Sequence, residues 1–559
     1  MDAPMAAGPL AGNAADDVPS LAVSAWNELF AGAARRPLEC CVMPRFLRRQ
    51  RWYAGKSREL SSVTLEDWCW WPEPGMSCAA TVWSVRYGDG GEEGYFVPLA
   101  VSPAADAERW RTAIPTALAA RLQTPQGAGI LFDALADDSA CTALLRLFEQ
   151  PREWPWQRGV LHTVVTPALP ELRGPTDAPL RIARGAPHQS NSFVLFLPRL
   201  VLKVFRKLEP GMHPDFEMGR YLTEHTTFDR VPKVAGALEY RRADGSPLLL
   251  GLLQQLVHNQ GNGWDHALDN VRTYFARALP AGHPAAALHP LPGLLDLSPP
   301  APPRAIAEGI GSYLESAARL GRRTAELHWA LASPTDDPDF APEPLTPADL
   351  SNWVDTARRE AREPLAALAQ QADRLTETVS EMAQRLHGRR TQLVRQFDEA
   401  LALHPQAVKT RCHGDYHLGQ VLCSEDDYVI LDFEGEPGRP LAQRRAKLSP
   451  LKDVAGMLRS FDYAAQVGLQ AATQDRPDDH HRLEPLARCW QRWTSRAFLR
   501  QYLATAADAP FLPADSRDLA ALLRFFLLEK ALYELKYELH HRPEWVHVPL
   551  RGLLDLLGS

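Results

Sequence analysis

Two kinds of apolar periodicity divide this chain, and they restrict its fold more than any other feature of the sequence. Before about residue 257 the apolar residues come in short alternating runs, which predict β-strands. Beyond residue 305 they recur at helical spacing over long stretches. A strand-rich part followed by a helical part, in a chain of 559 residues, predicts an α+β protein with two or three packed units.

The strand-rich part contains two groups of expected strands. In the first, Thr81–Tyr87 and Tyr95–Leu99 read as a hairpin across Gly88–Gly91. In the second, strands at Phe193–Phe196 and Leu200–Phe205 flank a turn at Leu197–Arg199. The other expectations are disorder over 1–20, helices at Leu21–Leu38, Pro214–Thr223, Ile306–Leu331, Leu350–Leu403, Pro450–Leu469, Trp490–Tyr502 and Leu519–His540, a strand at Leu248–Leu253 and an irregular loop over 279–304.

Charge and cysteine usage exclude several classes of function. The net charge of -7 argues against a nucleic-acid surface, because phosphate backbones require a basic face. Eight cysteines without a C-x-x-C pair indicate reduced thiols. No run reaches the roughly 18 apolar residues of a membrane span, and the first residues lack the order of a signal peptide. We therefore expect a soluble, cytoplasmic protein that binds neither nucleic acid nor membrane.

The most informative stretch is His-Gly-Asp-Tyr-His-Leu-Gly-Gln at 413–420, followed by Ile-Leu-Asp-Phe-Glu at 430–434. ATP-dependent phosphoryl transfer to a hydroxyl needs a carboxylate that accepts the proton and oxygen ligands for Mg²⁺. We expect Asp415 to be this base, and Gln420 and Asp432 to hold the metal.

The alternative for the same stretch is structural. Asp415 would cap a turn, the two histidines would belong to a polar surface loop, and Asp432 would end a strand. A zinc site at His413 and His417 is disfavoured, because Gly414 and Gly419 indicate a loop and no glutamate follows the first histidine.

Candidate residues for binding the ATP phosphates precede this stretch. Lys203 lies inside an apolar strand, where a lysine can reach phosphates, although an exposed edge-strand lysine is the alternative. Glu217, on the next expected helix, is placed to pair with Lys203 or to face solvent. The turn before a strand formed by Gln189, Ser190, Asn191 and Ser192 is a candidate phosphate cradle.

Taken together, these segments resemble the bacterial maltokinases, members of the aminoglycoside-phosphotransferase-like, protein-kinase-like superfamily. Their glutamine at the position of Gln420 is a family feature, where most relatives in the superfamily have asparagine. The residues at Tyr53–Ala54 and Lys56–Ser57 differ from those that are commoner in the family. The segments that carry the resemblance are Gln50–Lys56, Gln189–Ser192, Leu202–Lys203, Glu217, Gly321–His328, His413–Leu422, Leu431–Pro440, Ser449–Tyr463 and Glu529–Trp545.

The resemblance implies a two-lobed protein-kinase-like fold with an extra N-terminal β-rich cap domain. It also implies transfer of the ATP γ-phosphate to the anomeric hydroxyl of maltose, with Mg²⁺ as cofactor, for α-glucan synthesis. A trehalose synthase is an implied partner, because such kinases often occur fused behind one. The implied domains are a flexible segment with a short helix at 1–40, the cap at 41–160, a β-rich N-lobe at 161–257 and a helical C-lobe at 258–559.

The resemblance also assigns roles to single residues. Asp415 would be the base, Gln420 and Asp432 the metal ligands, and Lys203 the phosphate-binding lysine. The residues expected to contact the sugar are His413, Lys530, Tyr533 and Tyr537. Independently, steps of three and four residues place the last three on one helix face, although core packing of the tyrosines is the alternative.

Three other functions remain open from the sequence. A kinase of the same fold could act on glucosamine or an aminoglycoside, which would call for an acidic pocket. A binding module could use a kinase shape without catalysis. A structural partner of trehalose-converting enzymes could also coexist with catalysis.

Overall fold

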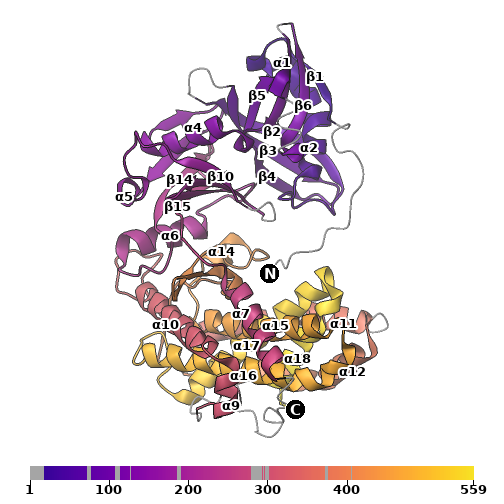
Figure 1. Cartoon of the computed structure of the whole chain (residues 1–559), viewed down its shortest axis with the longest axis vertical. Coiled ribbons are helices and arrows are strands. Elements are labelled where there is room, and N and C mark those ends of the chain that lie inside the picture. The colour runs from indigo at the N-terminus through magenta and orange to yellow at the C-terminus, as the bar shows by residue number, and fades with distance from the viewer. Residues whose placement is uncertain are drawn as a thin grey trace. The chain divides into compact units, whose positions relative to one another are not determined.

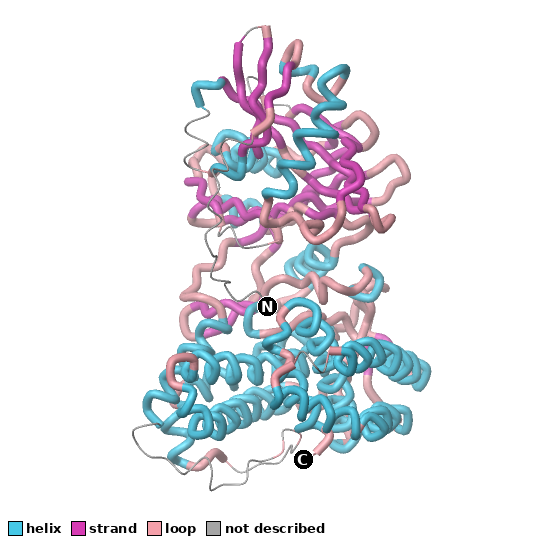
Figure 2. Tube along the Cα trace, turned by 90° about the vertical axis from the view of Figure 1, so that its right-hand side faces the viewer, coloured by secondary structure: helices cyan, strands magenta, loops and turns pink. Residues whose placement is uncertain are grey.

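The structure of this chain, a computed structural model, divides into two compact units: Met1–His225 with Pro232–Val257, and Thr226–Val231 with His258–Ser559 (Figure 1). The first is rich in strands and the second in helices (Figure 2), so the expected α+β class is confirmed. Within the described part of the chain, no helix is long and apolar enough to cross a bilayer. The structure describes residues 18–71, 77–106, 114–125, 127–185, 190–278, 293, 295, 301–371, 375–404 and 406–558.

The first unit begins with an eight-stranded sheet. Its order is β1-β6-β7-β5-β3-β4-β13, with β2 paired to β3. The expected hairpin of β3 and β4 is confirmed by its antiparallel register, and Gly90 in its turn has a φ of 84°. The elements are β1 (Ser20–Ala22), α1 (Gly32–Pro37), α2 (Met43–Arg49), β2 (Leu60–Trp70), β3 (Cys78–Tyr87), β4 (Glu92–Phe96), β5 (Leu99–Pro103), β6 (Leu118–Thr124) and β7 (Gly127–Asp133).

Two expectations for this sheet are wrong in part. The single strand expected over Tyr95–Leu99 is interrupted between β4 and β5, because Pro98 has no N–H for a strand ladder. The segment expected to be helical from Leu21 instead starts with β1, in which Leu21 pairs with Leu122 of β6. Pairing in a sheet therefore overrides the local helical periodicity there. Of the segment expected to be disordered, residues 1–17 lie outside the described residues.

A seven-stranded sheet follows, in the order β10-β11-β12-β15-β14-β9-β8. The β11–β12 hairpin is confirmed, and β12 also pairs with β15. Lys203 therefore lies on an interior strand. The elements are α4 (Asp138–Glu149), β8 (Glu153–Pro155), β9 (Val160–Val165), α5 (Leu169–Arg173), β10 (Arg181–Arg184), β11 (Ser192–Leu197), β12 (Leu200–Val204), β13 (Lys207–Leu208), α6 (Pro214–His225), β14 (Val234–Arg241) and β15 (Pro247–Gln255).

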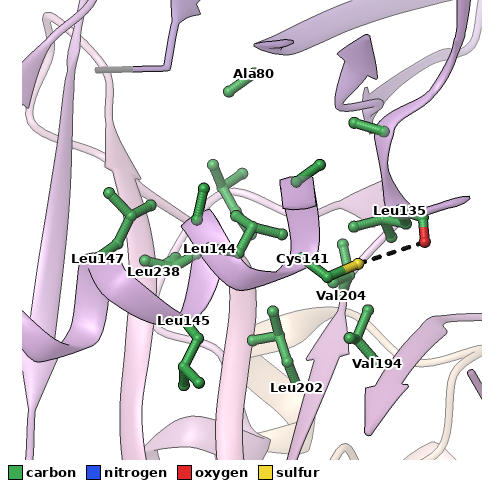
Figure 3. Packing of buried hydrophobic residues seen from close by; sticks show 14 of the residues in the cluster. Ala80, Leu135, Cys141, Leu144, Leu145, Leu147, Val194, Leu202, Val204 and Leu238 are labelled. Atoms are coloured by element: carbon green, nitrogen blue, oxygen red, sulfur yellow. Dashed lines mark hydrogen bonds between the residues drawn. The ribbon is translucent and has the colours of Figure 1, made fainter. Parts of the chain in front are cut away.

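One hydrophobic core joins the two sheets of the first unit. Figure 3 shows Leu144 and Cys141 of α4 packed near Val194 and Leu202 of the second sheet. Ala80 of β3, in the first sheet, belongs to the same buried cluster. The sheets also share a backbone pairing, because β13 pairs with β4.

The second unit is built mainly from helices. α10 packs closely on α16, and a Cβ on Gly321 of α10 would lie 2.1 Å from the Phe498 carbonyl oxygen of α16. α15 packs against both α16 and α17. The helices are α7 (Gly263–Ala278), α9 (Arg304–Ile310), α10 (Tyr313–Leu331), α11 (Pro347–Gln370), α12 (Glu377–Gly388), α13 (Arg390–Glu399), α14 (Leu441–Arg444), α15 (Leu451–Thr473), α16 (His480–Thr505), α17 (Ser516–His541) and α18 (His547–Leu556).

The expected helices are confirmed in type but two of them are divided. The one expected over Ile306–Leu331 is split into α9 and α10 at Gly311, whose φ of 71° ends a helix. The one expected over Leu350–Leu403 is split into α11, α12 and α13. The loop expected over 279–304 lies mostly outside the described residues.

Two short two-stranded sheets flank the loop at 413–420, and the second of them is a hairpin. One pairs β16 (Glu343–Pro344) with β17 (Val408–Lys409), which precedes the loop. The other pairs β18 (Val421–Ser424) with β19 (Asp427–Ile430), which follows it. The backbone N–H of Leu431 donates to the Gln420 carbonyl oxygen at 2.9 Å. The hairpin therefore brings the end of the loop next to the start of the 431–434 segment.

Candidate active site

A buried carboxylate on α15 holds the start of the 413–420 loop. The backbone N–H groups of His413 and Gly414 donate to the two carboxylate oxygens of Asp453 at 2.8 and 2.9 Å. Asp453 is 1% exposed, and its Oδ2 lies 3.2 Å from His328 Nε2. Burial would raise the pKa of Asp453, but the hydrogen bond from His328, the charges of His328 and His413 and the Gly414 N–H together outweigh it and lower the pKa. An ionised Asp453 thus fixes the backbone next to Asp415.

Replacing Asp453 with asparagine is expected to destabilise the protein. The carboxamide offers one oxygen where the carboxylate offers two, so one of the buried N–H groups of His413 and Gly414 loses its acceptor. The cost in free energy of unfolding should be about 1–3 kcal/mol, measured by urea denaturation. Asp355→Asn, at an exposed position of α11, is the control, and an equal effect of both changes would contradict this role.

Asp415 lies between a cation and a neutral imidazole. Lys530 Nζ donates to its Oδ1 at 3.1 Å. Burial would raise the pKa of Asp415, but the charge and hydrogen bond of Lys530, together with His417, outweigh burial and lower it. Burial also lowers the pKa of His417 to about 4, and His417 Nδ1 accepts the Gly419 N–H at 3.0 Å. Neutral His417 therefore carries its proton on Nε2, which lies 3.9 Å from Asp415 Oδ2.

Lys530 links Asp415 to a group of charged side chains that we call the six-charge cluster. Lys530 Nζ lies 2.7 Å from Glu436 Oε1, and Glu436 is 2% exposed. Burial would raise the pKa of Glu436, but the charges of Lys452, Lys530 and Arg439 outweigh it and lower the pKa. The members are Asp415, Glu436, Glu529, Arg439, Lys452 and Lys530.

The remaining ion pairs of the cluster are centred on Glu529. This carboxylate lies 2.6 Å from Arg439 Nη2 and 2.8 Å from Lys452 Nζ. Arg439 Nε also donates to Glu436. Within these six residues three cations face three carboxylates, and a fourth carboxylate, Glu360, also pairs with Arg439 at 3.3 Å.

Two of the three residues expected to contact the sugar on α17 lie at the cluster, and the third lies one turn further along. Lys530 Nζ is 4.9 Å from the centroid of the Tyr533 ring, and burial raises the pKa of Tyr533 to about 12. Tyr537 stacks on His541 with ring centroids 4.4 Å apart. An uncharged Tyr533 hydroxyl beside Lys530 can donate to or accept from a sugar hydroxyl.

His413 connects two loops. Its Nε2 donates to the Leu431 carbonyl oxygen at 2.7 Å, and its ring packs against those of Tyr416 and Phe433. The side chain is buried, with 1% exposure for the residue. Its contact with a substrate stays a prediction, and these bonds give it a positioning role.

The expected metal ligands are adjacent to each other. Gln420 Nε2 donates to Asp432 Oδ2 at 3.1 Å. Asp432 has a φ of 68°, an uncommon conformation for a residue other than glycine. Each side chain carries an oxygen of a type that suits Mg²⁺, although it is the amide nitrogen of Gln420 that faces Asp432 here. Gln420 and Asp432 therefore fit the ion that a kinase needs, and their role as ligands stays a prediction.

In the first unit, Lys203 forms a buried ion pair with Asp215 of α6. The Nζ and Oδ2 atoms are 2.7 Å apart, and the residues are 4% and 1% exposed. The alternative of a solvent-exposed Lys203 is therefore wrong. The expected pairing with Glu217, two residues beyond Asp215 on α6, stays a prediction.

The expected phosphate cradle is described only in part. Gln189 lies outside the described residues. Ser190 and Asn191 lead into β11, and the Ser192 hydroxyl accepts from Arg206 Nε at 2.8 Å. The role of the three described residues with phosphates stays a prediction.

Sequence reasoning missed Asp453, Asp215 and Glu436. Asp453 precedes the apolar run Val454–Leu458, and a charged residue in such a position is rarely buried without a partner. That signal could have marked Asp453 as buried, but Asp215 and Glu436 lie in polar, proline-containing segments that carry no such signal.

Comparison with known proteins gives a cap domain and a fold. Residues 46–137 match the family model described as the maltokinase N-terminal cap domain. A glucosamine kinase of Streptacidiphilus jiangxiensis is 30% identical over 333 residues, which are 59% of this chain and 62% of that protein. The chain thus matches less than two thirds of that relative's length. A glucosamine kinase of Mycolicibacterium smegmatis is 26% identical over 373 residues, 66% of this chain and 78% of that one.

Solved structures of glucosamine kinase have the same fold. The complex with glucosamine, ADP and inorganic phosphate has a TM-score of 0.58 at 23% identity, covering 91% of this chain and 96% of that one. A second crystal form has a TM-score of 0.59 at 22% identity, covering 90% and 96%. The chain therefore has a maltokinase-type cap and the two-lobed kinase-like fold, which confirms the resemblance drawn from the sequence.

Proposed function

We propose that this maltokinase-like chain is an ATP-dependent sugar kinase that transfers the γ-phosphate to the anomeric hydroxyl of maltose. The product would be maltose 1-phosphate, a precursor for α-glucan (glycogen) synthesis. ATP and Mg²⁺ are the proposed cofactors and the cytoplasm the proposed location. The observation that carries the proposal is the ionised Asp415 held against Lys530, on a loop fixed by Asp453.

Each residue has a proposed role that its surroundings support. Asp415 orients the acceptor hydroxyl and accepts its proton late in a loose transition state. Lys203 binds the ATP phosphates, supported by Ser190, Asn191 and Ser192, and Gln420 and Asp432 hold Mg²⁺, which would neutralise phosphate charge. Lys530 and Tyr533 bind the sugar.

The ammonium of Lys530 beside Asp415 favours a neutral acceptor. The six-charge cluster has three cations and three carboxylates, and Lys530 contacts the proposed base itself. A protonated amino sugar would meet the Lys530 ammonium there, and like charges at close range repel. A neutral sugar has hydroxyl edges for these groups and an apolar face for Tyr533.

The second candidate is phosphorylation of glucosamine, which the names of the curated relatives favour. A panel of maltose, glucose, glucosamine and kanamycin with ATP and Mg²⁺, followed by ADP release and ³¹P NMR of the product, separates the candidates. We expect the highest kcat/KM with maltose and an anomeric phosphate. Turnover of glucosamine or kanamycin without maltose would reject the proposal, and ADP binding without any turnover would favour a non-catalytic module.

Exchange of Lys530 for methionine should shift the pH dependence of the reaction. Loss of the ammonium removes the charge that lowers the pKa of Asp415, so this pKa should rise. Because a base acts in its ionised form, activity falls as the pH drops through its pKa. The acid limb of kcat/KM should therefore move to higher pH than in the wild type.

Lys536→Met is the matched control for this shift. Lys536 lies on the same helix, is exposed and pairs with Glu363, so its loss should leave the acid limb in place. An unchanged limb in the Lys530 variant would contradict the assignment of Asp415 as the base. The proposed association with trehalose synthase is a separate question that co-purification tests.

A further inference from the structure

A cavity of about 240 Å³ lies beside the proposed acceptor site, within the helical unit. It borders Gly414 and Gly435, next to the Asp415 loop and the 431–434 segment. Pockets for drug-sized ligands have volumes of roughly 300–1,000 Å³. This one is therefore suited to a smaller group, such as one sugar ring.

One wall of the cavity is aromatic. Trp353 of α11 and Phe526 of α17 line it with ring centroids 5.5 Å apart, and Phe525 also lines it. Phe525 and Phe526 are buried, while Trp353 is half-buried. The indole of Trp353 is thus the aromatic side chain with surface left to stack on a ligand.

Four polar residues that line the cavity belong to the six-charge cluster. Glu436, Glu529, Arg439 and Lys452 all line the cavity. Glu529 already accepts from Arg439 and Lys452, but a carboxylate has about four acceptor sites. These carboxylates can therefore accept hydrogen bonds from neutral hydroxyls, and the cations can donate hydrogen bonds to them.

A chain of contacts links the cavity to the proposed acceptor site. Glu436 lines the cavity and contacts Lys530, which contacts Asp415. From Phe526 in the cavity to Tyr533 beside Lys530 the helix rises about 10 Å. That length exceeds a single pyranose ring and suits a disaccharide.

We propose that this cavity binds the non-reducing glucosyl ring of the acceptor while the reducing ring lies at Asp415, Lys530 and Tyr533. The inference rests on the proposed function and deepens it, because it names the side chains that recognise the second ring. The apolar C–H face of this ring stacks on Trp353. Its hydroxyl edge bonds to Glu529, Glu436 and Arg439. The cavity thus makes the site specific for a disaccharide rather than a single hexose.

The test compares Trp353→Ala with Trp353→Phe, using maltose and glucose as acceptors. Loss of the indole should lower the ratio of kcat/KM for maltose to that for glucose by about tenfold, the factor that corresponds to the stacking contribution of an aromatic ring. The phenylalanine variant keeps an aromatic face and should regain most of that ratio. Thermal unfolding of both variants checks that they fold.

A second readout does not require turnover of glucose. In saturation-transfer NMR with maltose and ADP, the protons of the non-reducing ring should receive saturation in the wild type and lose it in Trp353→Ala. An unchanged acceptor ratio and unchanged saturation in that variant would overturn the subsite alone. Transfer to glucosamine but not to maltose in the wild type would overturn the proposed function, and the subsite with it.

Discussion

Asp415→Asn is expected to lower kcat by about 10²–10⁴-fold, the range that a positioned general base contributes. The amide keeps the size of the side chain and its hydrogen bond from Lys530, but it cannot accept the proton of the acceptor hydroxyl. Binding of ADP should be retained, because Asp415 itself has no proposed contact with the phosphates or with Mg²⁺. Steady-state ADP release measures the first effect and calorimetric titration with ADP the second.

The control for this variant is Asp426→Asn. Asp426 is exposed in the turn between β18 and β19, so the same chemical change there should leave kcat near the wild-type value. Near-normal turnover by Asp415→Asn would remove the base from the proposed mechanism. Loss of ADP binding together with turnover would point to a disrupted fold instead.

Lys203→Met should reduce the free energy of unfolding by about 3–5 kcal/mol, because it leaves the buried Asp215 carboxylate without this cation. Urea denaturation measures the loss. The double variant Lys203→Met with Asp215→Asn should recover part of it, since a neutral amide is less costly to bury than an unpaired charge. Both variants should also bind ATP more weakly than the wild type.

Lys207→Met provides the comparison for a solvent-exposed pair. The Lys207 side chain is 43% exposed and lies 2.8 Å from Glu93, and such pairs are worth about 0–1 kcal/mol. Equal stability losses for the Lys203 and Lys207 variants would show that Asp215 does not depend on Lys203.

The parts of the fold that sequence predicted are those set by local pattern. The β3–β4 hairpin follows from alternation around Gly88–Gly91, and α15, α16 and α17 follow from helical periodicity. Where pairing with a distant strand decides, as for β1 against β6, local periodicity pointed to a helix and was wrong. Likewise, the split between α9 and α10 depends on one glycine, Gly311. An isolated glycine does not by itself end a helix predicted from apolar periodicity.

In the candidate site, too, local features could be predicted from the sequence and contacts between distant residues could not. The loop at 413–420 was recognisable because residues close in sequence carry its chemistry. Asp453 lies 40 residues beyond His413, and Glu436 meets Lys530 across 94 residues. Nothing local in the sequence indicates such pairings. The hydrogen bonds between Asp453 and the loop backbone and the ion pairs of Lys530 with Asp415 and Glu436 are therefore seen only in the folded chain.

Arg206 ties the cap to the strands that follow it. It is 2% exposed, and its guanidinium donates to Asp133 of β7 at 2.5 Å and to Ser192 of β11 at 2.8 Å. With the shared core and the β4–β13 pairing, this bond joins the described part of the cap to the Lys203 sheet within one compact unit. A shortened chain that began after α4 would expose apolar surface and leave the buried guanidinium of Arg206 without its Asp133 partner. We therefore expect a chain shortened in this way to be less stable than the full chain.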